Sequence, residues 1–262
     1  MTTGRSQWED LGSRPQPSWY LDPLAARQKR DAHLDLIRRW WPPSHPHRIL
    51  KTDLFEEAFG LDCILPAIAP RVRFACGIDQ AFSTALAAAR RYPASPALAS
   101  DVRHLPFSSA SFDLVLSTST LDHFAHPSDF LTAIAEIHRI LRPGALLILT
   151  LDNPSNPLYA PLHWFSHTPL APFSLGYTPS LPTLRSVLDK AGFDIEHEDF
   201  LLHNPRLVST ALFLLCRRLL GRYGDLPIAV LLRAFAALHR LPTRRWTACF
   251  QAVAARKRVP LR

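Results

Sequence analysis

Short apolar segments alternate with longer amphipathic segments along residues 48–153, and this alternation constrains the fold more than any other feature of the chain. Helix-like segments separate the strand-like ones. Strands that alternate with helices favour a parallel sheet with helices on both of its faces. The sequence therefore predicts an α/β fold, with strands in residues 48–55, 71–79, 96–101, 112–119 and 145–152 and helices in residues 56–68, 80–92 and 127–141.

The segments on either side of this core complete the predicted organisation. A helix is expected from Asp22, with Asp as the cap and Pro23 at the first helical position, and Ser128 is expected to cap the helix at 127–141. We predict a flexible tail over residues 1–18 and one domain over 19–262. Within that domain we expect an N-terminal helix in 19–45, the core in 48–153, an irregular loop in 154–182, a helix in 181–193 and strands in 194–202 and 246–258. The apolar segment 206–241 is predicted to form a pair of helices.

Composition excludes several classes of site. The 262 residues include only nine glycines and no Gly-x-Gly, so a Walker phosphate loop and a dinucleotide fingerprint are both absent. The four cysteines show no Cys-x-x-Cys spacing, and no metal site is expected. The amino-terminal residues lack the apolar core of a signal peptide, and no run of about 18 apolar residues occurs, which favours a cytoplasmic protein.

The net charge of +8 has two interpretations. It reflects either a generally basic surface or an acidic partner. Most basic residues occur as dispersed pairs, and we find no nucleic-acid motif, so nucleic acid is an unlikely partner. Peripheral contact with an anionic membrane stays open.

Two stretches carry a resemblance to a known family. Residues 106–124, "PFSSASFDLVLSTSTLDHF", and residues 136–154, "EIHRILRPGALLILTLDNP", resemble class I S-adenosylmethionine-dependent methyltransferases of the type that acts on small molecules and lipids. The resemblance implies S-adenosyl-L-methionine as cofactor. It also implies a Rossmann-like, doubly wound, mostly parallel seven-stranded sheet whose last strand is antiparallel, here with an added C-terminal helical pair. Residues 193–202 and 246–255 would form the hairpin at the sheet edge.

The resemblance assigns cofactor contacts to the ends of three strands. Asp79 matches the acid that holds the ribose hydroxyls, and a carboxylate can accept two such bonds. Asp101 matches the residue that accepts from the adenine amino group, and Val102 offers its N–H and an apolar wall. Ser117 lies near the methionine end. In the alternative interpretation Asp79 caps the following helix and Asp101 only makes a turn.

Candidate catalytic residues follow the strand at 112–119. His123 is the candidate general base because its ordinary pKa lies near neutrality, and Asp122 precedes it. The alternative is that His123 only packs or makes a local hydrogen bond. Asp152 and Asn153 are expected to face the same crevice, because ligands of parallel sheets bind at the carboxyl ends of the strands. Their alternative role is to make the turn before Pro154.

The turn after the first strand departs from the family pattern. Relatives carry glycines there, whereas "RILKTDLFEEAFG" offers only Gly60. In one interpretation Asp53 and Glu57 replace the backbone contacts, with Asp53 accepting from the cationic amino group of the cofactor. In the other the site has decayed. The pattern of Asp79 and Asp101 favours the first.

The sequence thus predicts methyl transfer from S-adenosylmethionine to a small molecule, with an apolar or lipid-like acceptor as one interpretation. The alternative is a non-catalytic binding or scaffold protein on the same fold, associated or not with a membrane surface. The apolar helices of 206–241 are expected to pack on the sheet edge, to form a lid over the acceptor, or to contact a membrane.

Overall fold

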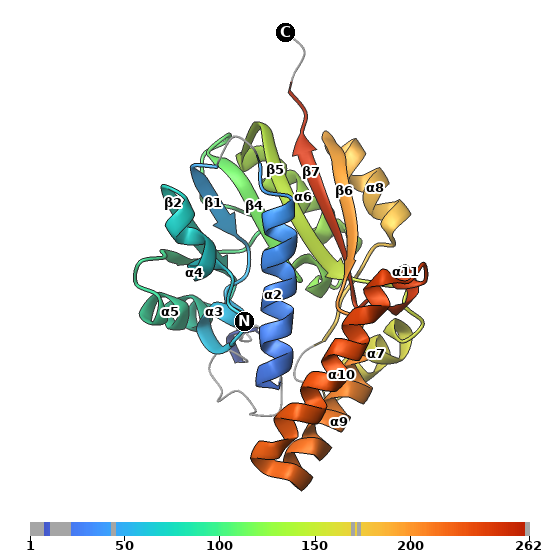
Figure 1. Ribbon diagram of the computed structural model, residues 1–262. Helices are drawn as coiled ribbons and strands as arrows, with labels where there is room; N and C mark the ends of the chain where they lie inside the picture. The colour runs from blue at the N-terminus through green and yellow to red at the C-terminus, as the bar shows by residue number, and fades with distance from the viewer. Residues whose placement is uncertain (1–7, 11–21, 43–45, 169–170, 172–173, 260–262) are drawn as a thin grey trace, which may run out of the picture.

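The computed structural model describes residues 8–10, 22–42, 46–168, 171 and 174–259. Their centre is a seven-stranded sheet in the order β3-β2-β1-β4-β5-β7-β6 (Figure 1). Strands β1 to β5 are parallel, and β7 runs antiparallel to both β5 and β6. The predicted fold class is confirmed. The strands are β1 Arg48–Lys51, β2 Phe74–Asp79, β3 Ala97–Ala99, β4 Phe112–Thr118, β5 Leu141–Asp152, β6 Phe193–Leu201 and β7 Phe250–Lys257.

Helices cover both faces of this sheet, and further helices lie beyond its lower end in Figure 1. Asp22 accepts a hydrogen bond from the N–H of Leu24 and Pro23 is the first helical residue, as predicted. The sheet-covering helices are α2 Pro23–Arg39, α3 Phe55–Phe59, α4 Leu65–Ile68, α5 Phe82–Arg91, α6 Pro127–Ile140 and α8 Leu181–Lys190. The others are α7 Tyr159–Ser166, α9 Arg206–Leu220, α10 Asp225–Ala237 and α11 Arg244–Thr247.

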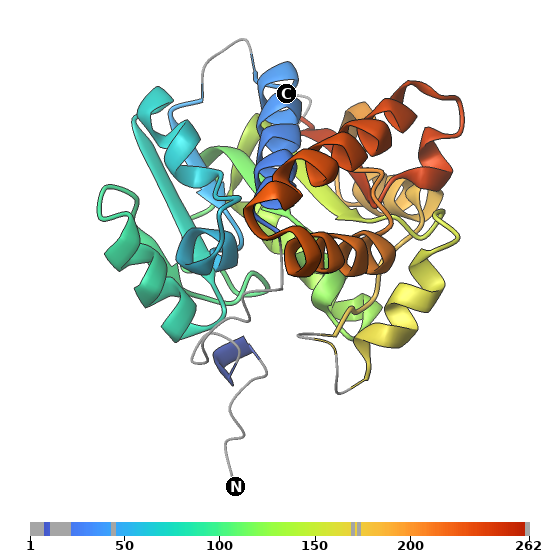
Figure 2. The same cartoon turned by 60° about the horizontal axis from the view of Figure 1, so that its bottom comes forward.

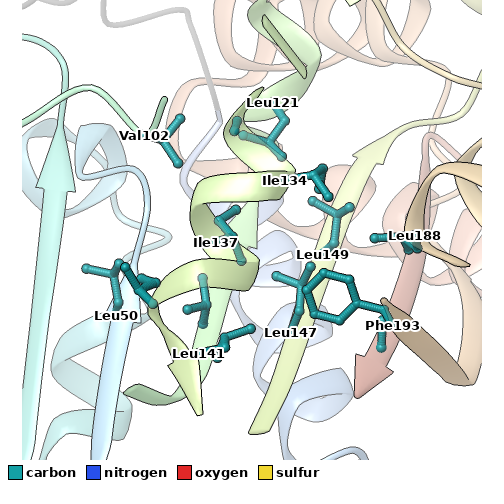
Figure 3. Packing of buried hydrophobic residues seen from close by; sticks show 14 of the residues in the cluster. Leu50, Val102, Leu121, Ile134, Ile137, Leu141, Leu147, Leu149, Leu188 and Phe193 are labelled. Carbon is teal, nitrogen blue, oxygen red and sulfur yellow. The ribbon is translucent and has the colours of Figure 1, made fainter. Parts of the chain in front are cut away.

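The core consists of two apolar layers because successive strand residues point to opposite faces of the sheet. On one face Leu50, Val115 and Leu147 pack against α6 and α8, and Figure 3 shows Ile134, Ile137 and Leu188 among them. On the other face the neighbouring residues of the same strands pack against α2, α4 and α5: Ile49, Leu114 and Ile148. Burial on both faces explains why these strands read as continuous apolar runs.

The strand order reverses between β1 and β4. The loops that follow these strands leave the sheet in opposite directions, so a crevice opens at their carboxyl ends, where ligands of such sheets bind. Figure 1 shows the paired helices α9 and α10 beyond this end of the sheet.

Several local predictions were wrong. The strand expected at 48–55 ends at Lys51, and the helix expected at 56–68 is divided into α3 and α4. Ser128 does not cap α6: the helix begins at Pro127 after His126 and has no side-chain cap. The segment 154–182 is not wholly irregular, because its apolar residues form α7. Residues 246–247 end α11, and strand β7 begins only at Phe250. Helix α7 buries only Ser166 and α11 buries no residue, so neither helix belongs to the core.

Most of the predicted tail lies outside the described residues. Residues 8–10 are helical, and the ring of Trp8 packs edge-on against the ring of His123, with 4.9 Å between the ring centroids. This small part of the amino-terminal segment therefore reaches the end of β4.

Candidate functional site

A cavity of about 830 Å³ lies at the carboxyl ends of β1, β2, β3 and β4. Its volume is in the range of small-molecule sites. Polar residues from the strand ends line one part, and helices α2, α7 and α9 line the rest. The cavity therefore combines the predicted crevice of the sheet with surfaces from helices outside the 48–153 core.

Asp79 ends β2 and lines this cavity. Its Oδ2 accepts from the N–H of Leu54 at 3.1 Å, and its Oδ1 accepts from the N–H of Ala81 at 2.8 Å. Burial raises the pKa of the carboxyl to about 6 against the opposing effect of these two N–H groups. Each oxygen still has one lone pair for a ligand hydroxyl. Asp79 can therefore accept from the N–H groups of Leu54 and Ala81 and still accept from a ligand.

Asp101 and Val102 also line the cavity, after β3. The Asp101 carboxylate is engaged by Arg103, whose Nε lies 3.0 Å and whose Nη2 lies 2.6 Å from Oδ2. Burial tends to raise the pKa of Asp101, but the hydrogen bonds and charge of Arg103 outweigh it and lower the pKa. Asp101 is therefore an ionised carboxylate whose oxygens are already occupied by a cation.

The turn after β1 presents carboxylates to the cavity. Asp53 lines the cavity, and its Oδ1 accepts from the N–H of Phe55 at 2.6 Å. Burial and the nearby charge of Glu56 raise the pKa of Asp53 well above its ordinary value. Glu56 also lines the cavity and pairs with Lys29 of α2 at 2.8 Å.

Glu57 takes a structural place instead of the predicted ligand-facing one. Its Oε1 accepts from the N–H groups of Ile64 and Leu65 at the start of α4, at 3.0 and 2.9 Å. Its Oε2 accepts from the buried Nζ of Lys51 at 2.8 Å. Neighbouring residues of a helix point about 100° apart, so only one of the two glutamates can face the cavity. That one is Glu56, which the sequence interpretation did not choose.

The loop after β4 places His123 on the cavity wall. Its Nδ1 lies 3.2 Å from the carbonyl oxygen of Ser174. Ser119 and Thr120 line the cavity too, whereas Ser117 is fully buried behind them and its Oγ accepts from the hydroxyl of Thr52 at 3.0 Å. The structure thus brings His123 to the cavity and leaves Ser117 outside its lining.

Asp122 is fully buried beside His123 and does not line the cavity. Its Oδ2 accepts from the N–H of Asp152 at 2.8 Å and from the hydroxyl of Ser119 at 3.3 Å. Burial and the neighbouring charge of Asp152 raise its pKa. Asp122 therefore joins the loop after β4 to the end of β5.

Asp152 and Asn153 were expected to face the crevice, but neither residue lines the cavity. Asp152 is buried and paired with Arg206, the first residue of α9, and it is Arg206 that lines the cavity. The amide of Asn153 donates to the carbonyl oxygens of Arg245 and Ala248. Sequence reasoning missed Arg206, Lys29 and Trp8, because all three reach the cavity from segments distant in the sequence.

The helical side of the cavity is apolar. Helix α7 contributes Leu162 and Phe165, and α9 contributes Leu207, Phe213 and Leu214. His163 and His167 of the same region do not line the cavity. Across the described part of the chain no group of three His, Cys, Asp or Glu side chains is arranged to hold a metal ion.

Residues 58–149 match the family described as "Methyltransferase domain". The chain is 35% identical over 97 residues to an uncharacterized methyltransferase of Synechocystis sp., covering 35% of this chain and 42% of that protein. It is 43% identical over 58 residues to phthiotriol/phenolphthiotriol dimycocerosates methyltransferase 1 of Mycobacterium ulcerans, covering 22% of this chain and 20% of that protein. The chain thus spans less than half the length of either curated relative.

A solved structure from Thermotoga maritima has the same fold. It is described as an S-adenosylmethionine-dependent methyltransferase, possible histamine N-methyltransferase. It superposes with a TM-score of 0.59 at 16% identity, over 90% of this chain and 92% of that one. The likeness covers more of the chain than residues 58–149.

Proposed function

We propose that this chain, whose core is a class I S-adenosylmethionine-dependent methyltransferase domain, binds S-adenosylmethionine in the cavity and transfers its methyl group to a small apolar acceptor. The observation that carries the proposal is the two-sided lining of this cavity. Carboxylates from three strand ends lie on one side, and leucine and phenylalanine side chains of α7 and α9 lie on the other.

The donor and acceptor groups of the strand ends fit the cofactor. Asp79 retains one lone pair on each oxygen for the two ribose hydroxyls, and Val102 supplies a buried apolar wall for the adenine. Asp53 and Glu56 suit the cationic amino group of the methionine end, since both are carboxyls on the cavity wall. Asp101 contributes mainly by holding Arg103 and the adjoining turn, because that guanidinium already occupies its oxygens.

The chemistry requires alignment more than activation. The bound cofactor supplies an activated methyl group on a sulfonium, so the protein must place the acceptor atom in line and exclude water. Such positioning is worth effective molarities of about 10⁵–10⁸ M. His123, on the cavity wall, is suitably placed to take a proton from an acceptor that carries one. Asp122 acts as a positioning residue through Ser119 and the end of β5.

The apolar character of the acceptor is inferred from α7 and α9. Burial of an apolar ligand surface is favourable by about 25 cal/mol per Å². The relative from Mycobacterium ulcerans is named for phthiotriol/phenolphthiotriol dimycocerosates, and it matches this chain over 58 residues.

Calorimetric titration of the purified chain with S-adenosylmethionine tests the proposal. We expect saturable 1:1 binding, and we expect Asp79→Ala to weaken it at least 30-fold, because the ribose loses two hydrogen bonds to a charged group. Asp31→Ala is the matched control, since Asp31 is an exposed carboxylate of α2 outside the cavity lining.

Absence of binding by the unaltered chain would contradict the proposal and leave a non-catalytic role. Unchanged affinity in Asp79→Ala, with a normal unfolding transition, would contradict the assignment of the ribose site. Transfer of a labelled methyl group from the cofactor into an apolar metabolite extract then identifies the acceptor.

A further inference from the structure

Helix α9 is apolar on two opposite sides. The cavity side carries Leu207, Phe213 and Leu214. The other side carries an outer stripe, defined as Val208, Leu212, Leu215 and Leu219, whose members recur at the i, i+4, i+7 and i+11 positions of one helical face. Their exposed fractions are 54, 36, 51 and 70%. The second apolar side therefore faces solvent, and of the apolar residues on the cavity side only Phe213 is buried.

The connection to α10 extends this apolar surface. Tyr223 is 69% exposed and Leu226 is 74% exposed, and they follow Leu219 at the turn between the two helices. Figures 1 and 2 show α9 and α10 side by side, projecting beyond the sheet as a hairpin. The exposed leucines thus gather on an element that protrudes from the molecule.

Positive charge accompanies these leucines. Arg218, Arg222 and Arg233 are exposed on the hairpin, and among the described residues none of them forms an ion pair with a carboxylate. Asp225 is the only acidic residue in positions 200–262, and it pairs with Arg217. The surface therefore combines exposed apolar side chains with uncompensated arginines.

We propose that the outer stripe of α9 docks the protein on an anionic phospholipid membrane. A helix that lies in the interface buries an apolar face below the headgroups, and flanking basic residues are attracted to an anionic surface. Of the helices that the structure describes, none has the length and apolarity to cross a bilayer.

Charge argues against a second copy of the chain as the occupant. A two-fold contact would bring identical surfaces together, with arginines opposite arginines and only the paired Asp225 to offset them. Anionic headgroups supply the missing negative charge. The inference concerns a binding partner, and it does not depend on methyl transfer.

Vesicle flotation tests the inference with the full chain. We expect binding to vesicles that contain about 30% phosphatidylserine in phosphatidylcholine, and at least tenfold weaker binding to phosphatidylcholine alone. Leu212→Ser/Leu215→Ser/Leu219→Ser should weaken binding to the anionic vesicles at least tenfold. Arg218→Gln/Arg222→Gln should weaken it severalfold and reduce its dependence on salt, since exposed charges are screened.

The matched control is Leu61→Ser/Leu131→Ser/Leu158→Ser, because these leucines are 48, 49 and 48% exposed and lie outside both the hairpin and the cavity lining. We expect the control to bind vesicles normally. Calorimetry with S-adenosylmethionine on the same proteins separates the two proposals, because the altered leucines do not line the cavity.

Three results would overturn the inference. The first is failure of the unaltered chain to float with anionic vesicles. The second is equal loss in the control and stripe variants. The third is a dimer in solution that the stripe variant converts to a monomer without any vesicle binding, which would make this surface an interface between copies.

Discussion

Two neighbouring carboxyls on the cavity wall, Asp53 and Asp79, have pKa values that burial raises. The negative charge of Glu56 also raises the pKa of each. Protons therefore compete with any cation or hydroxyl that these groups bind. This competition gives the proposed cofactor site a pH dependence that an exposed site would lack.

We expect the affinity for S-adenosylmethionine to fall as the pH drops through about 6, where Asp79 takes up a proton and no longer accepts two hydroxyl bonds.

A cationic ligand favours the ionised form of Asp53, so binding should release a proton. Calorimetry in two buffers with different ionisation enthalpies measures that proton, and Asp53→Asn should abolish its release. A pH-independent affinity between 5 and 8 would contradict these roles.

At the scale of elements, one ion pair joins α9 to the sheet. Asp152 at the end of β5 is fully buried, and Arg206 at the start of α9 covers it and packs over the ring of Phe250, with 4.4 Å between the guanidinium carbon and the ring centroid. Asp122 adds a second buried carboxyl next to Asp152. Arg206 therefore neutralises a site where negative charge would otherwise be unstable.

We expect Arg206→Met to lower the free energy of unfolding by about 3–5 kcal/mol, because it leaves the Asp152 charge buried without a partner. Arg218→Met is the matched control on the exposed side of the same helix, and it should change the free energy by about 0.5 kcal/mol or less. Urea unfolding measures both. Equal effects of the two substitutions would show that the buried pair is not a stabilising link.

At the scale of the whole molecule, the sheet and the hairpin differ in how well they are buried. Strands β4 and β5 are buried almost throughout, whereas α9 buries only Ser209 and Phe213. Local opening requires less free energy where few apolar contacts are lost.

Hydrogen exchange should therefore separate the two parts. Amides of β4 and β5 should exchange only through global unfolding, and amides of α9 and α10 should exchange at least 100-fold faster through local opening. Mass spectrometry of peptic fragments measures this. Anionic vesicles should slow exchange in the hairpin alone if it docks on them.

The same contrast explains what the sequence could predict. Periodicity identified the core strands, because residues such as Leu114 and Val115 alternate between two buried layers. The resemblance to a known family supplied the antiparallel pair of strands at the sheet edge and the acids Asp79 and Asp101 at the strand ends. Lys29, Arg206 and Trp8 were missed because long-range packing brings them to the cavity, and the choice between Glu56 and Glu57 depended on one turn of helix.

The buried pair of Lys51 and Glu57 limits how this protein can be redesigned. A glycine loop grafted onto residues 52–60 would remove Glu57. The buried ammonium of Lys51 would then lose its carboxylate partner, and two backbone N–H groups at the start of α4 would lose their acceptor. An uncompensated interior charge costs about 3–5 kcal/mol. Conversion of this turn to a glycine loop would therefore require changes in the strand, the loop and the next helix together.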